Sequence, residues 1–146
     1  MCFNININVV QFKVMVDLPC YKIVSIIKSK PDTVQSLYYN KKYKFNEKYT
    51  LPIPIIPIAD IYIEKGYHSY RCFDEDLERM LYFLNELQNR STNRQKTLAI
   101  VKCIIPAGSY CYLDIIKEVM VSDMIIVKEI VKIKTTKSHK YDNATT

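Results

Sequence analysis

Glycine is scarce in this chain of 146 residues, which has only two, Gly66 and Gly108. Glycine readily adopts positive φ and allows another backbone to approach closely, so these two positions are expected to mark tight local geometry. The chain contains no G-x-G-x-x-G, phosphate-loop or G-x-S-x-G signature. The common nucleotide-binding folds and serine hydrolases therefore find no support in the sequence.

Paired metal ligands are also missing. The chain has two histidines and five cysteines, and the cysteines are widely spaced with no C-x-x-C pair. Structural metal sites usually show ligands paired at short spacing, so we predict neither a metal nor another cofactor. Reduced, mostly buried thiols are the favoured interpretation of the cysteines. They are Cys2, Cys20, Cys72, Cys103 and Cys111.

No apolar run is long enough for a membrane-spanning helix, which needs about 20 residues. Residues 53–63 form one of the longest apolar stretches, and Pro54, Pro57 and Asp60 interrupt it. The N-terminus lacks the basic flank, apolar block and cleavage site of a signal peptide. We therefore expect a cytoplasmic protein with no membrane partner.

The net charge of +6 is spread along the chain rather than gathered in one segment. Nucleic-acid-binding proteins more often show a clustered basic face and a recognisable module, so nucleic acid is an unlikely partner. The best local candidate is the segment at residues 38–44, where bases can stack on tyrosines beside lysines. A solvated strand whose lysines discourage edge pairing explains the same residues and is favoured.

Hydrophobic patterning predicts a single β-rich α+β domain over residues 1–134, followed by a polar, flexible tail at residues 135–146. About six strands are expected in segments rich in β-branched residues. The three prolines at residues 52–57 predict an extended connector instead of a helix or central strand. The expected strands are residues 5–16, 20–27, 37–45, 98–105, 110–113 and the tract 119–134, which includes a possible turn or bulge.

One helix is predicted at about residues 74–88. Asp74 can cap its N-terminus, and leucine and methionine side chains recur at three- and four-residue spacing after it. Such a stripe covers one face of a helix and suits packing on a sheet. The residues of this stripe are Leu77, Met80, Leu81, Leu84 and Leu87.

The phrase Lys65-Gly66-Tyr67-His68-Ser69-Tyr70 is the clearest candidate for a site. A turn there places an imidazole beside a hydroxyl and two phenols, groups that can act as a base or hold a nucleotide sugar. A structural histidine at a strand end is the favoured alternative, because one histidine without a partner defines no mechanism.

The dipeptide Ser122-Asp123 interrupts an apolar tract. It either lines a site or forms a turn or bulge between two strands, and the turn or bulge is favoured. No catalytic residue is predicted. The predicted ligand-binding residues are Tyr21, His68, Ser69, Tyr70, Ser122 and Asp123.

Four phrases follow one another along the chain: Tyr21-Lys22-Ile23-Val24, Lys65-Gly66-Tyr67-His68-Ser69-Tyr70, Val101-Lys102-Cys103-Ile104-Ile105-Pro106-Ala107-Gly108-Ser109, and Val121-Ser122-Asp123-Met124-Ile125-Ile126-Val127. Their order gives the chain a resemblance to small uncharacterised proteins of bacteriophages and large DNA viruses. It covers about residues 20–128. It implies viral provenance, the cytoplasm of a host cell as the location, and a common fold, and it supplies no catalytic residues.

Three hypotheses of function follow, in this order. The first is a noncatalytic binding module whose partner is a host protein or a small nucleotide-like ligand. The second is an enzyme that resembles the ADP-ribosyltransferases and uses NAD, with Glu118 or Glu129 as its only candidate catalytic glutamates. The third is a virion component, for which no repeat or coiled coil is visible.

Overall fold

The computed structural model describes residues 3–37, 40–55, 57–58, 61–71 and 77–134. Within these ranges the chain forms twelve strands, one α-helix and one short 3-10 helix. The α-helix is α1 (Leu77–Gln88), and the 3-10 helix is η2 (Ser91–Asn93). The strands are β1 (Phe3–Asn4), β2 (Val9–Lys13), β3 (Leu18–Ile26), β4 (Thr33–Ser36), β5 (Lys42–Lys44), β6 (Lys48–Thr50), β7 (Tyr62–Ile63), β8 (Tyr67–Tyr70), β9 (Leu98–Ile105), β10 (Tyr110–Asp114), β11 (Val119–Ser122) and β12 (Met124–Lys134).

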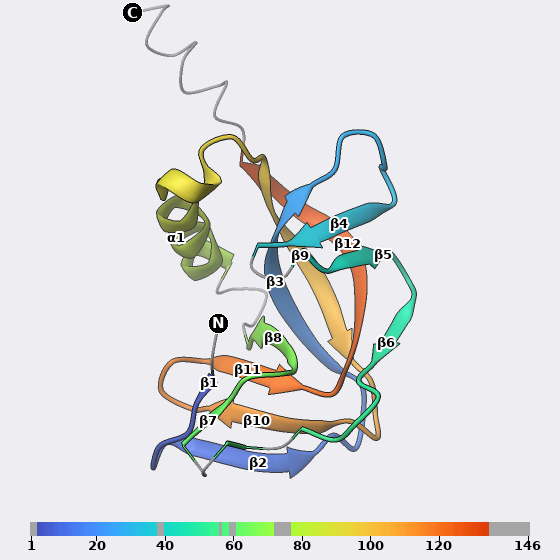
Figure 1. The fold of residues 1–146 in the computed structure, drawn as a ribbon, viewed down its shortest axis with the longest axis vertical. Helices are drawn as coiled ribbons and strands as arrows, with labels where there is room; N and C mark the ends of the chain where they lie inside the picture. Colours follow the sequence, from blue (N-terminus) through green and yellow to red (C-terminus); the bar gives the residue numbers. More distant parts are fainter. Residues whose placement is uncertain (1–2, 38–39, 56, 59–60, 72–76, 135–146) are drawn as a thin grey trace, which may run out of the picture.

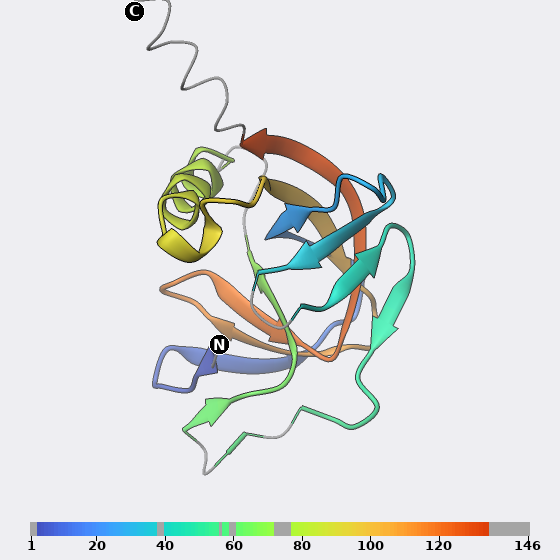
Figure 2. The same ribbon diagram turned by 45° about the horizontal axis from the view of Figure 1, so that its top comes forward.

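Ten of the strands belong to one sheet, and β1 pairs with β7 in a separate two-stranded sheet. The main path of the large sheet runs β2-β10-β11-β8-β3-β9-β12-β6, while β4 pairs with β3 and β5. In Figures 1 and 2, the strands β3, β4, β5, β9 and β12 lie together with α1 in one half of the molecule. The strands β1, β2, β7, β10 and β11 form the other half, and β8 lies between the two.

The strands β3 and β9 lie at the centre of the fold, and both of their faces are buried. They pair antiparallel over eight residues, from Leu18 opposite Ile105 to Ser25 opposite Leu98. Cys20 and Val24 of β3 pack into the main core, whereas the alternate residues Tyr21 and Ile23 pack toward α1. Strands buried on both faces are rich in apolar residues throughout, which explains the sequence of β9.

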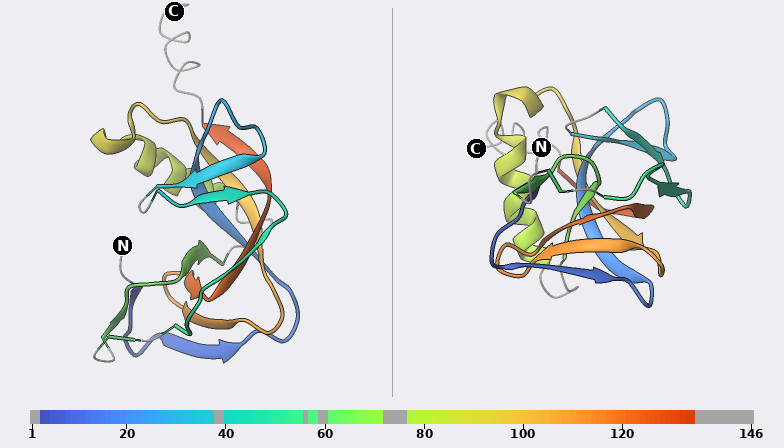
Figure 3. Two further views of the ribbon diagram at one scale, coloured as in Figure 1. Left: turned by 45° about the vertical axis from the view of Figure 1, so that its right-hand side comes forward. Right: turned by 60° about the horizontal axis from the view of Figure 1, so that its bottom comes forward.

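The helix α1 lies against the outer face of β3 and β9 (Figure 3). Met80, Leu84 and Leu87 are buried on one side of it, as the three- and four-residue spacing of the stripe predicts. The C-terminus of the helix is held by side chains and not by a glycine. Asn93 Nδ2 donates to the Leu87 carbonyl at 2.8 Å, and Gln88 Nε2 donates to the Asn93 carbonyl at 2.9 Å.

The expectation of an α+β domain with about six strands is wrong, since the described residues form twelve strands in two sheets. Two predicted strands are interrupted. Residues 5–16 contain a turn in which the Val9 amide donates to the Asn6 carbonyl at 3.0 Å, and residues 119–134 divide at Asp123 into β11 and β12. Strands of two to four residues are too short to show a period of two, so β1, β4, β6 and β7 were not predicted.

The predicted helix N-cap at Asp74 and the predicted tail at residues 135–146 lie outside the described residues. In the proline segment, Ile55 is buried beside Phe3 and Ile63, whereas Ile53 is 53% exposed. Among the described residues, no helix is both long enough and apolar enough to cross a membrane.

Candidate functional site

The strand β8 is fully paired on one side and almost unpaired on the other. All four of its residues pair with β11, but it meets β3 only where Tyr70 lies opposite Tyr21. Beyond that point the two strands diverge, so the sheet opens between β3 and β8. The polar backbone groups that β8 turns toward this opening need partners other than a neighbouring strand.

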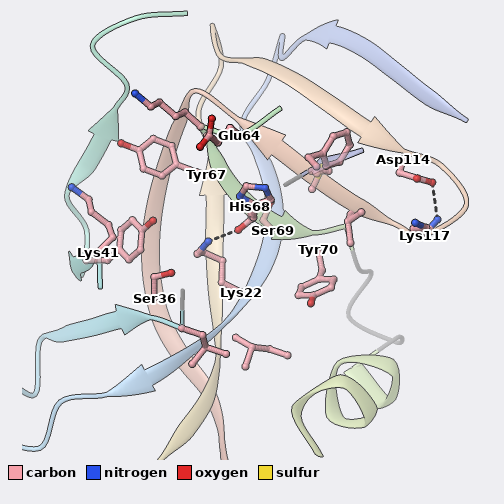
Figure 4. Close-up of a pocket in the computed structure, with 18 of the residues that line it drawn as sticks. Lys22, Ser36, Lys41, Glu64, Tyr67, His68, Ser69, Tyr70, Asp114 and Lys117 are labelled. Carbon is pink, nitrogen blue, oxygen red and sulfur yellow. Dashed lines mark hydrogen bonds between the residues drawn. The ribbon is translucent and has the colours of Figure 1, made fainter. Parts of the chain in front are cut away.

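A cavity of about 550 Å³ lies at this opening. Residues 66–70, which are Gly66 and all of β8, line it together with residues of β3, β5 and α1. Figure 4 shows Lys22, His68 and Ser69 at its centre, with Tyr67 and Lys41 to one side and Asp114 and Lys117 to the other. Cavities of 300–1,000 Å³ are typical of small-molecule sites. The opening of the sheet is therefore of a size that suits a small ligand.

Lys22 is the most unusual residue of the cavity. It follows Cys20 on the core-facing side of β3 and is only 8% exposed. Its ammonium group donates to the His68 carbonyl and lies 5.5 Å from the centroid of the Tyr43 ring. Among the described residues no carboxylate lies within 4.0 Å of Lys22 Nζ. A buried ammonium without a carboxylate is costly, and burial accordingly lowers the pKa of Lys22, although the Cys103 and Cys20 thiols partly oppose this effect.

Two residues that line the cavity carry a buried polar atom for which the described residues supply no hydrogen-bond partner of ordinary geometry, His68 Nε2 and Ser69 Oγ, although Ser69 still interacts with the Cys20 thiol closely enough to lower the pKa of that thiol. Ser69 is 3% exposed. Burial, helped by the charge of Lys22, lowers the pKa of His68 to about 4, while a hydrogen bond with the Gly66 backbone opposes the shift. The imidazole is therefore neutral at physiological pH. Unpaired buried polar groups are rare in folded proteins and call for a partner.

We expect His68 to make the protein less stable as the pH falls. The pKa of this histidine is about 4 in the folded state and about 6.5 when unfolded, so the unfolded state binds more protons between these values. The contribution to stability is complete above pH 6.5, and about 2–3 kcal/mol of it is lost by pH 4. Urea unfolding at several pH values measures this loss, and His68→Asn should remove that part of the pH dependence. Equal pH dependence in both proteins would contradict the assignment.

A pair of thiols lies behind the cavity. Cys20 and Cys103 are directly opposite each other on β3 and β9, and both are fully buried. Burial raises the pKa of Cys103. Burial acts in the same direction on Cys20, but hydrogen bonds with Cys103 and Ser69 and the charge of Lys22 outweigh it and lower the pKa of Cys20. These two thiols and the buried Cys111 are free, whereas Cys2 and Cys72 lie outside the described residues.

The structure brings together three of the predicted ligand-binding residues, since His68, Ser69 and Tyr70 all line the cavity. Tyr21 is not one of the lining residues, and its side chain packs toward α1. Residues 67–70 form the strand β8 directly after Gly66 and not the turn that the ligand-binding interpretation assumed, and a strand position for His68 is what the favoured alternative described. Lys22 was missed as a site residue, although a lysine within the apolar segment 20–27 was a signal that could have indicated it.

Ser122 and Asp123 lie at the junction of β11 and β12 and are not lining residues of the cavity, although Ser122 pairs with Tyr67, which is one. The Ser122 hydroxyl donates to the Met124 carbonyl at 2.9 Å. The Asp123 carboxylate accepts from the Tyr110 amide at 2.9 Å, and the Asp123 carbonyl accepts from the Leu51 amide at the same distance. These bonds hold the bend between the two strands, which is the turn or bulge that the sequence favoured.

The remaining candidates of the sequence are two glutamates and the segment 38–44, of which Lys41 and Tyr43 line the cavity. Glu118 forms two hydrogen bonds with Arg71, at 2.6 and 2.8 Å, and Glu129 is exposed on β12. Neither glutamate lines the cavity. In the segment 38–44 the Tyr43 ring is buried against Tyr67 and Tyr49 and is no surface platform for bases, while residues 38–39 lie outside the described residues. Within the described ranges there is no cluster of three or more side chains able to hold a metal.

No protein-family model, curated protein or solved structure matches this chain.

Proposed function

We propose that this protein is a noncatalytic module that binds a small nucleotide-like anion in the cavity between β3 and β8. The observation that carries the proposal is Lys22, a buried ammonium group at the cavity wall with no carboxylate partner in the described part of the chain. A phosphate or carboxylate of a ligand would supply the missing negative charge. Because Lys22 itself is buried, that interaction would be stronger than one at the surface.

The other charges at the cavity support an anionic ligand. Three further lysines line it, Lys41, Lys65 and Lys117, and only two acids do so, Glu64 and Asp114. The Asp114 carboxylate is already occupied, since it accepts from the Ile116 and Lys117 amides at 3.0 and 2.9 Å. The balance of the lining is therefore positive, which attracts anions.

The neutral groups of the cavity suit the base and sugar of a nucleotide. Tyr67 and Tyr70 supply aromatic surface, on which a flat base can stack. His68 lines the same cavity and its Nε2 has no hydrogen-bond partner among the described residues, so a sugar hydroxyl or an exocyclic amino group is a suitable partner for it. A ligand that combines a flat ring, hydroxyls and a phosphate would use all three kinds of group.

A thermal-shift panel tests the proposal. The protein is melted with nucleoside mono-, di- and triphosphates, cyclic nucleotides and NAD, and with inorganic phosphate and adenosine as separate halves. A ligand present at 100 times its Kd adds about 2.7 kcal/mol of stability, which raises the Tm of a domain of this size by about 5–10 °C. We expect at least one nucleotide to raise the Tm by this amount and to be recovered from the mixture without chemical change. Turnover of NAD would instead favour the ADP-ribosyltransferase-like alternative, and no shift with any member would contradict the proposal.

The biological setting that we propose comes from the sequence resemblance. In this proposal the chain is an accessory protein of a bacteriophage or large DNA virus that acts in the host cytoplasm. A small ligand is preferred over a host protein as the partner because Lys22 and His68 line a cavity and are not part of an open surface. No feature of the described residues adds support for a virion component.

A further inference from the structure

We propose that Lys22 forms a reversible imine with an aldehyde that enters the cavity between β3 and β8. The inference rests on the proposed function, since it uses the same cavity and the same ligand-binding groups. It extends that function from an anion held by charge alone to a carbonyl compound held by a covalent bond.

Imine formation requires an amine at a fixed position beside open space. Lys22 meets this requirement because β3 pairs with β9 over eight residues on one side, whereas on its other side it pairs with β8 at only one residue. The amine is fixed by the His68 carbonyl and the Tyr43 ring, and the residue lines the cavity. A carbonyl compound in the cavity can therefore approach the nitrogen without displacing a strand.

The amine must also be uncharged, because only its free lone pair attacks a carbonyl carbon. An ammonium group uses all three of its hydrogens in strong interactions, yet Lys22 has one carbonyl acceptor and no carboxylate partner among the described residues. Its burial lowers its pKa, which increases the fraction of free amine at neutral pH. A lysine in an apolar pocket is activated as a nucleophile in this manner.

The reaction is balanced without an oxidant or reductant. The nitrogen lone pair attacks the aldehyde carbon, a proton moves from nitrogen to the former carbonyl oxygen, and a carbinolamine forms. Loss of that oxygen as water then produces the C=N bond. The reverse reaction with water releases the aldehyde, so the modification is reversible.

The lining of the cavity indicates which aldehyde is favoured. The tyrosines accept a flat ring, and the surrounding lysines accept a phosphate. An aromatic aldehyde that carries a phosphate therefore combines noncovalent binding with imine formation. Pyridoxal 5′-phosphate is a suitable probe of this class, and benzaldehyde is the matching probe without charge.

Reductive trapping tests the inference. The protein is incubated at pH 7 with an equimolar amount of pyridoxal 5′-phosphate, the imine is reduced with sodium borohydride, and labelled lysines are located by peptide mass mapping. Exposed lysines have a pKa of about 10.4 and are almost fully protonated at this pH. We expect Lys22 to carry at least about ten times more label than any other lysine, since the probe is concentrated in the cavity by its phosphate.

The control substitutions keep the test decisive if one variant is unstable. Lys22→Met and Lys22→Arg should both lose the main label, whereas Lys132→Met, at an exposed position of β12, should retain it. Label spread evenly over the surface lysines of the wild-type protein would overturn the inference.

Competition with nucleotides separates the inference from the proposed function. A nucleotide that protects Lys22 from labelling supports both. Nucleotide binding without any label at Lys22 overturns the imine and leaves the binding function intact. Label at Lys22 by both probes, with no nucleotide bound or protective, supports the imine and overturns the nucleotide-like ligand.

Discussion

Replacement of Lys22 by methionine is expected to stabilise the unliganded protein and to abolish nucleotide binding. Methionine has a similar length and shape but no charge, so it removes the cost of burying an ammonium group that has no carboxylate partner in the described structure. Exchanging buried charged groups for apolar ones of similar volume is often stabilising, and a gain of about 1–3 kcal/mol is expected here. The loss of the charge should weaken binding at least about 100-fold, which corresponds to about 2.7 kcal/mol.

Urea unfolding and calorimetric titration of the two proteins measure these effects. The control is Lys132→Met on β12, where the side chain is exposed. This substitution should change the free energy of unfolding by no more than about 0.5 kcal/mol and should leave binding intact. If Lys22→Met instead lowers the stability by several kcal/mol, the lysine is a structural residue and the argument for a ligand fails.

Replacement of Gly66 by alanine is expected to destabilise the protein by about 2–3 kcal/mol through overpacking. A Cβ atom at this position would lie 2.3 Å from Val121 Cγ2, and the φ angle of Gly66 is +156°. Val121 is fully buried on β11, so it has little room to yield. The glycine therefore permits the close approach of the chain entering β8 to β11. Thermal or urea unfolding measures the loss.

Two further variants separate the clash from other effects. Gly108→Ala meets no atom within 4 Å and bears only the strain of its φ of +94°, so it should cost about 1–2 kcal/mol. In a Val121→Ala background, Gly66→Ala should cost at least 1 kcal/mol less than in the wild type, because the clashing methyl group is gone. An equal cost of Gly66→Ala in both backgrounds would contradict a clash with Val121.

The sequence predicted those strands whose runs of apolar and β-branched residues are long enough to recognise. The segment 98–105 coincides with β9, and the segments 20–27 and 110–113 lie close to β3 and β10. Their length and β-branched composition produce a clear signal. The strand β8 was not among the predicted strands, since the phrase after Gly66 was compatible with a turn or with a strand end. Its pairing depends on β11, which is about 50 residues away in the sequence. Pairing between residues so far apart produces no recognisable pattern in the sequence of residues 67–70 alone.

Some residues of the candidate site could likewise be predicted from the sequence and others could not. His68, Ser69 and Tyr70 could be found because unusual polar residues follow a rare glycine. Lys22 was not assigned, although its place in the apolar segment 20–27 was a signal, since lysine in a strand most often points to solvent. Its place inside the fold depends on the register of β3 with β9 and on the divergence of β8. These features are properties of the assembled sheet and do not appear in a segment of sequence.

The central claim is that a nucleotide-like anion binds between β3 and β8. The most direct test is a titration of ¹⁵N-labelled protein with the nucleotides of the panel, in which the backbone amide chemical shifts are recorded. We predict that the largest shifts occur at Lys22, Ile23 and residues 66–70, which line the cavity. The largest shifts on another surface, or no shift with any nucleotide at about 1 mM, a concentration that detects even weak binding, would contradict the claim.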